Sequence, residues 1–159
     1  MISEILISNE KNNFYKLFVN ENGKNKPIRI NIESVNLPFG LEDFNNKVII
    51  NFELDDSKSC KEYEKLVKLI EKNITNLIEK DDIDVKSVLY EKEDRPTLCR
   101  AYVKKNRNKI ITIYKINEKE VSIYDINKNE KYNIEIELSG IWKYNNTAGI
   151  FLNIISLKK

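Results

Sequence analysis

A single helical pattern lies between segments of alternating residues, and this order limits the folds open to the chain. From about residue 59 to residue 79, apolar residues recur every three or four positions and form one stripe: Tyr63, Leu66, Val67, Ile70, Ile74, Leu77 and Ile78. Ser59 and Glu62 fit a capping box at the start of this stripe. We therefore expect a helix that begins at this box, packs its stripe on a sheet and ends near residues 79–82.

Extended segments are predicted on both sides of the helix. In the segment that begins at residue 28, Ile28, Ile30 and Ile32 alternate with polar neighbours, as in a half-buried strand. The same reading predicts extended structure over residues 2–7, 14–20 and 48–54 before the helix, and over 98–105, 109–116, 120–126, 131–138, 140–145 and 148–157 after it.

This order of elements predicts a mainly β fold with one long helix, namely an OB-fold-like barrel with extra strands. In such a barrel we expect the helix to lie between the third and fourth barrel strands. A β-sandwich covered by the helix is the alternative. Because the 159 residues contain no repeat or low-complexity linker, we expect residues 1–159 to form a single domain.

The composition argues against catalysis and against a membrane protein. The chain has no histidine, which removes the usual general base, and its four glycines form no phosphate-binding loop. It has no apolar run of about 18 residues and no secretory signal, and its two cysteines form no metal-type pair. We expect a cytoplasmic protein that is not secreted, is not an enzyme and needs no cofactor. The aspartates at 55–56 and 81–84 could hold a cation, but they fit helix caps and turns better.

Positive charge is concentrated in residues 95–115, which carry +7 in a chain of net charge +2. The segment contains no acid, and it contains Tyr102 and Tyr114. Phosphates bind basic side chains and unpaired bases stack on aromatic rings, so this mixture indicates a surface for single-stranded nucleic acid. The basic residues are Arg95, Arg100, Lys104, Lys105, Arg107, Lys109 and Lys115.

Strand parity predicts a hairpin for this basic segment. With a loop at residues 106–108, Ala101 and Val103 turn inward and pair with Ile113 and Ile111, while Arg100 faces Tyr114 on the outside. The predicted contacts with nucleic acid are Arg100, Tyr102, Lys104, Lys105, Arg107, Lys109 and Tyr114. A solvated charged hairpin without a ligand is the alternative interpretation.

The C-terminal third resembles the single-stranded DNA-binding proteins of certain phages and large DNA viruses. The resemblance lies in an apolar–Gly–apolar–Trp strand over residues 138–144 and a closing strand that begins Gly149-Ile150-Phe151. It extends to Pro38-Phe39-Gly40 before residues 48–54, to the basic segment 104–113, and to Tyr124-Asp125-Ile126. These pieces stand in the expected order and span residues 36–157.

The resemblance implies an OB-fold protein that coats single-stranded DNA during replication. It makes Trp142 either a stacking platform or a core residue, and it leaves the same two roles open for Phe39. Replication proteins and further copies of the chain are the implied partners, although the chain ends Leu157-Lys158-Lys159 where phage members typically carry an acidic tail. RNA binding and a protein-interaction or adaptor role are the alternatives.

Overall fold

Five strands wrap around the core in the computed structural model, which describes residues 5–159. Within this barrel β14 pairs antiparallel with β4 and β15, β15 pairs parallel with β9, β9 pairs antiparallel with β6, and β6 lies against β4. The bounds are β4 Ile28–Leu37, β6 Lys47–Leu54, β9 Thr97–Val103, β14 Glu130–Tyr144 and β15 Thr147–Lys158. Around the barrel the strands run first, second, third, fifth and fourth in chain order, and this confirms the predicted OB-type β fold.

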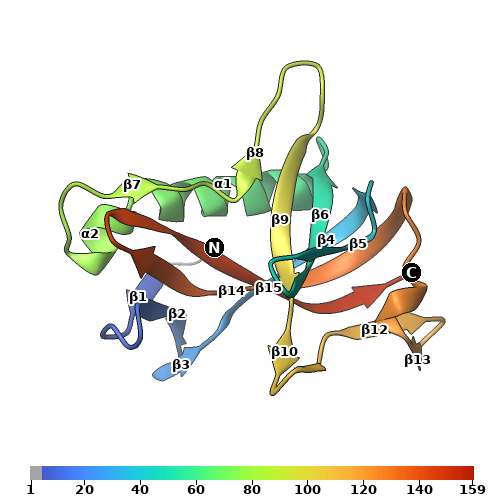
Figure 1. Ribbon diagram of the computed structural model, residues 1–159, viewed down its shortest axis with the longest axis horizontal. Helices are drawn as coiled ribbons and strands as arrows, with labels where there is room; N and C mark the ends of the chain where they lie inside the picture. The colour runs from blue at the N-terminus through green and yellow to red at the C-terminus, as the bar shows by residue number, and fades with distance from the viewer. Residues whose placement is uncertain (1–4) are drawn as a thin grey trace.

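Further strands extend this barrel and lie along its edges (Figure 1). The first part of β14 pairs with β4 and its last part pairs with β2, so β2 enlarges the sheet beyond the barrel. The additional strands are β1 Ile5–Ile7, β2 Phe14–Glu21, β3 Lys24–Lys26, β5 Leu41–Phe44, β7 Asp84–Val85, β8 Leu89–Tyr90, β10 Lys105–Asn106, β11 Lys109–Ile110, β12 Ile113–Ile116 and β13 Lys119–Val121, followed by a 3-10 turn at Ile123–Asp125.

The predicted helix is present as α1, Lys58–Lys72, continued by the short α2, Ile74–Ile78. It buries Tyr63, Val67 and Ile70 of the predicted stripe against the barrel, together with Cys60, which the prediction did not include. Its N-cap is Ser57, whose hydroxyl accepts a hydrogen bond from the Cys60 amide, so the predicted capping box at Ser59 is wrong. The Asp55 side chain accepts a bond from the Ser57 amide, and this turn starts the helix earlier than the capping box implied.

The position of the helix in the barrel order also differs from the prediction. It connects β6 to β9, the second and third barrel strands, rather than the third and fourth. The reason is that residues 14–20 do not form a barrel strand: β2 pairs with the end of β14, outside the five-stranded order. One long strand, β14, also replaces the two predicted over residues 131–138 and 140–145.

The predicted pairing of residues 98–105 with 109–116 is wrong. Arg107 and Asn108 both adopt positive φ, of 50° and 66°, and close a tight two-residue turn in which Lys105 faces Ile110. After this hairpin the chain does not continue alongside β9. Instead, β12 pairs in parallel with β15. The change moves side chains to the opposite face: Tyr114 is 1% exposed, while Ile111 and Ile113, predicted inward, are 42% and 39% exposed.

Tyr114 is therefore a core residue, and its hydroxyl should make folding sensitive to alkali. Burial, with help from the neighbouring Tyr132, raises the pKa of Tyr114 to about 12 from its ordinary value of 10.0. The folded protein holds this proton more tightly than the unfolded chain, so the stabilisation is complete below pH 10 and is lost as the pH rises toward 12. We predict that Tyr114→Phe makes the free energy of unfolding fall less steeply across this window.

Urea unfolding at a series of pH values through the window measures this effect. Tyr124→Phe is the control, because Tyr124 is 69% exposed. Parallel pH profiles for Tyr114→Phe and the wild type would contradict the placement of Tyr114.

Candidate nucleic-acid interface

Aromatic rings from three separate strands form a continuous row on the outer face of the sheet. Tyr102 of β9 stacks on Phe151 of β15, with ring centroids 4.9 Å apart and an interplanar angle of 16°. Phe14 of β2 meets the edge of Phe151 at 5.8 Å. All three side chains are half-buried, because β-strand alternation sends their neighbours Ala101, Leu152 and Tyr15 into the core. We call Phe14, Phe151 and Tyr102 the aromatic row.

Two glycines make room for the rings on this face. A Cβ atom at Gly140 would lie 2.4 Å from the Phe14 ring, and one at Gly149 would lie 2.9 Å from the Trp142 ring. Trp142 is half-buried and stands opposite Phe14 in the β14–β2 register, so it continues the row. Gly140 of the Gly–apolar–Trp pattern thus makes room for Phe14, and Gly149 at the start of the closing strand makes room for Trp142.

Cations flank the aromatic row. The Lys47 ammonium lies 4.9 Å from the centroid of Tyr102 and 5.8 Å from that of Phe151. Farther along the same face, the Arg100 guanidinium lies 4.8 Å from the centroid of Phe44. Its Nε atom is buried and has no hydrogen-bond partner among the described residues. The rings are therefore held under positive charge, as a surface for stacked bases and phosphates requires.

A groove of about 500 Å³ opens beside the row, between the β2–β3 hairpin and the start of the basic hairpin. Phe14 and Phe151 form its apolar part, and Lys16, Lys26 and Lys104 supply positive charge. The remaining lining residues are Leu17, Phe18, Asn25, Pro27, Glu137, Ser139 and Asn153. The groove therefore offers rings, amides and cations together, which suits a nucleotide.

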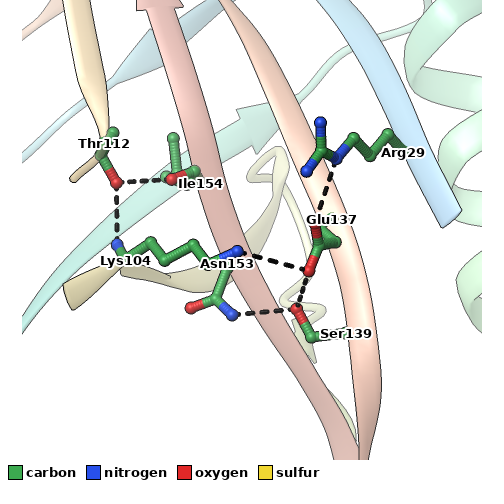
Figure 2. A network of polar contacts seen from close by, with 7 residues as sticks. All are labelled: Arg29, Lys104, Thr112, Glu137, Ser139, Asn153 and Ile154. Atoms are coloured by element: carbon green, nitrogen blue, oxygen red, sulfur yellow. Dashed lines mark hydrogen bonds and ion pairs between the residues drawn. The ribbon is translucent and has the colours of Figure 1, made fainter. Parts of the chain in front are cut away.

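A network of polar contacts holds one wall of the groove (Figure 2). Glu137 of β14 accepts a bond of 3.0 Å from the Arg29 Nε and pairs with the Lys104 ammonium at 3.8 Å. The Ser139 hydroxyl donates to Glu137 at 2.9 Å, and the Asn153 amide donates to Ser139 at 2.9 Å. The side chains are thus positioned by β4, β14 and β15 rather than by a loop.

The basic hairpin, β10 and β11 with the residues between them, projects from the end of β9 (Figure 1). Lys105, Arg107 and Lys109 are exposed on it. Its base is fixed by Thr112, whose hydroxyl accepts a bond from the Lys104 amide at 2.8 Å and donates to the Ile154 carbonyl at 2.5 Å. The hairpin is therefore attached to β15, next to the groove.

The predicted site residues fall into three groups. Arg100, Tyr102, Lys104 and Trp142 lie on the outer face, whereas Lys105, Arg107 and Lys109 lie on the basic hairpin. Tyr114 is buried and packs against Tyr132 at 5.7 Å, so its predicted role as an exposed stacking residue is wrong. The register of the two-residue turn is the reason. Phe39 is 46% exposed, and so it is not a core residue.

Sequence reasoning missed several residues of the face. Phe14 and Lys16 carried a signal, because they alternate with Tyr15 and Leu17, which are buried. Phe151 stood in the motif behind the resemblance, but no role was assigned to it. No local signal pointed to Lys47, Arg29 or Glu137, because their partners lie on other strands.

The rival sites find little support in the structure. Over residues 5–159, no group of three or more Cys, Asp or Glu side chains is arranged to hold a metal ion. In the same range, no helix has the length and apolar character needed to cross a membrane. The side chain of Asp55 caps the turn before α1.

Comparison with known proteins gives no sequence relative but a clear structural one. No protein-family model matches the sequence, and no curated protein matches it. The single-stranded DNA-binding protein gp2.5 of bacteriophage T7 matches with a TM-score of 0.58 at 9% identity, over 84% of this chain and 86% of that protein. The single-stranded DNA-binding protein of bacteriophage Enc34, solved in complex with single-stranded DNA, matches with a TM-score of 0.57 at 12% identity, over 99% of this chain and 95% of that one.

The chain has the fold of the phage single-stranded DNA-binding proteins. The sequence resemblance is thereby confirmed at the level of the fold. At these identities the match carries no residue roles, so the site must be argued from the side chains of this chain.

Thr112 offers a test of how the basic hairpin is attached. Thr112→Val keeps the shape of the side chain but leaves the Lys104 amide and the Ile154 carbonyl without their partner. We predict a loss of about 1–3 kcal/mol in the free energy of unfolding, the usual cost of buried unpaired polar groups. Denaturant unfolding measures this loss.

Thr97→Val is the matched control, since the half-buried Thr97 of β9 makes no side-chain hydrogen bond with any described residue. Equal stability changes for the two variants would show that the Thr112 bonds do not hold the hairpin.

Proposed function

We propose that this chain binds single-stranded DNA along its outer face, without catalysis, and coats the DNA that is exposed during replication. The aromatic row with cations around it is the observation that carries the proposal. The Enc34 protein of the same fold, solved with single-stranded DNA bound, supports it. In this role the protein works in the cytoplasm, where replicating DNA, replication proteins and further copies of the chain are its partners.

Different side chains bind the bases and the phosphates. Bases that stack on Tyr102 and Phe151 gain about 1–3 kcal/mol each, whatever their identity. Phosphates are held by Lys16 and Lys47 beside the row and by the exposed cations of the basic hairpin. Binding of this kind tolerates any sequence, and it needs neither a nucleophile nor a cofactor.

The stacking surface also accepts RNA, because no contact on this face depends on the absence of a 2′-hydroxyl group. An adaptor role for the basic hairpin is the remaining alternative. One set of binding measurements with different nucleic acids separates these roles.

We predict tight binding to oligo(dT), weaker binding to duplex DNA of equal length, and an affinity that falls with salt. Each phosphate contact contributes a slope of about 0.7 in a plot of log affinity against log salt for single strands. Arg107→Gln in the basic hairpin should flatten the slope by about this amount. Fluorescence anisotropy across a salt series measures it, with Lys119→Gln outside the face as the control.

Three other outcomes of these measurements would contradict single-stranded DNA as the ligand. Preference for oligo(U) over oligo(dT) would favour RNA as the ligand. Equal affinity for duplex DNA would indicate a non-specific basic patch. An absence of binding at low salt would leave the adaptor role.

The aromatic row provides the second test. Tyr102→Leu and Phe151→Leu preserve apolar cover but remove the flat rings, so we predict that each weakens oligo(dT) binding by about 5- to 150-fold, the loss of one stacked base. Tyr124→Leu is the control, because Tyr124 is exposed on the 3-10 turn outside the row. Affinities unchanged by both row variants would exclude stacking as the source of binding.

A further inference from the structure

The groove contains an acidic side chain at a place where phosphate binding would favour a basic one. Glu137 is the one acidic residue among the described residues that line it. Only 11% of its side chain is exposed, so the carboxylate is fixed in the wall and cannot swing out to solvent. A carboxylate in this position opposes the proposed anionic ligand, which makes its presence informative.

The surrounding contacts hold the Glu137 side chain in place. Arg29 approaches one carboxylate oxygen at 3.0 Å, while Lys104 at 3.8 Å and Ser139 at 2.9 Å approach the other. Glu137, Arg29 and Asn153 are direct neighbours on three adjacent strands, so sheet pairing sets their places. Two cations of the face are thus engaged by an internal anion.

The lysines at the rim of the groove form fewer and weaker ion pairs than Arg29 and Lys104. Lys16 has no carboxylate within ion-pair range among the described residues, and Lys47 stands over the aromatic row without one. Lys26 pairs with Glu21 at 3.4 Å, but both side chains are more than half exposed, and such a pair is weak. The groove therefore has one buried carboxylate that offsets the charge of Arg29 and Lys104 in its wall, while the lysines at its rim keep their charge free for a ligand.

This arrangement suits only one orientation of a strand. Base edges carry hydrogen-bond donors and tolerate a carboxylate, while phosphates are repelled by it and attracted by the rim lysines. A single strand can turn its bases inward and its phosphates outward. A duplex cannot, because its bases are paired and its phosphates meet the protein first.

We propose that Glu137 makes the groove reject double-stranded DNA. The proposal rests on the proposed function, since it concerns the same face. Specificity then arises from a repulsive element as well as from stacking, because a like charge weakens the wrong ligand more than the right one. Arg29 and Lys104 hold the carboxylate in place and act as positioning residues.

The test compares Glu137→Gln with the wild type on oligo(dT) and on duplex DNA of the same length, by fluorescence anisotropy at one low salt concentration. Glutamine can still accept the bond from Ser139, but it removes the charge. Duplex affinity should rise about tenfold, which corresponds to about 1.4 kcal/mol. Oligo(dT) affinity should rise much less, so the ratio of the two Kd values falls.

Glu135→Gln is the matched control. Glu135 lies two residues earlier on the same face of β14, and it forms no ion pair with any described residue. It changes the net charge of the protein equally, so a general electrostatic effect would appear in both variants. An equal rise in duplex affinity for Glu135→Gln and Glu137→Gln would overturn the proposal.

Arg29→Gln tests the opposite direction and keeps the proposal falsifiable if Glu137→Gln fails to fold. Arg29 is 45% exposed, and its loss leaves Glu137 less neutralised, so the ratio of duplex to oligo(dT) Kd should rise. A ratio unchanged in both variants, with the wild type still bound to oligo(dT), would overturn the role of Glu137 alone. No wild-type binding to oligo(dT) would overturn the proposed function itself.

Discussion

The pairing of β14 with β15 supports the barrel and the proposed binding face together. Its two strands run side by side from Tyr144 and Thr147 back to Asn133 and Lys158, with irregularities between Glu135 and Ile136 and between Leu138 and Gly140. Ile136 and Ile154 point into the core, and their neighbours Glu137 and Phe151 point outward. The irregularity between Leu138 and Gly140 reverses the alternation along β14, so that Ile141 is buried and Trp142 lies on the outer face. The position of Phe14 depends on the glycine at position 140, because a side chain there would collide with the Tyr15 carbonyl and the Phe14 ring.

Local periodicity accounts for the parts of the fold that were predicted. Strands and the helix were found because burial of one face imposes a repeat on neighbouring residues, as in Ile28, Ile30 and Ile32. The order of the barrel strands was harder to predict from the sequence, because pairing partners such as β4 and β14 lie about a hundred residues apart in the chain. The tight turn at Arg107 and Asn108 was missed because neither residue is the glycine that such turns favour.

The candidate site was predictable in charge but not in shape. Basic residues between positions 95 and 115 gave a correct location for the hairpin, because the number of charges in a segment does not depend on the strand register. Aromatic contacts do depend on the register, because it decides which face a ring occupies. The shift at the turn placed Tyr114 in the core, whereas Tyr102 of β9 lies on the outer face. The rings that complete the row come from β2 and β15, so only the three-dimensional pairing brings Phe14 and Phe151 to Tyr102.

In the proposed function, the outer face gains its selectivity from rigidity rather than from the amount of charge. A mobile lysine attracts any polyanion, whereas a stacked ring pair and a buried carboxylate act only on a ligand that fits them. Here the stacked pair is Tyr102 and Phe151. Glu137 is held from both sides by Arg29 and Lys104. Because the same sheet fixes the attractive rings and the repulsive carboxylate at once, a strand must expose its bases before it can satisfy both.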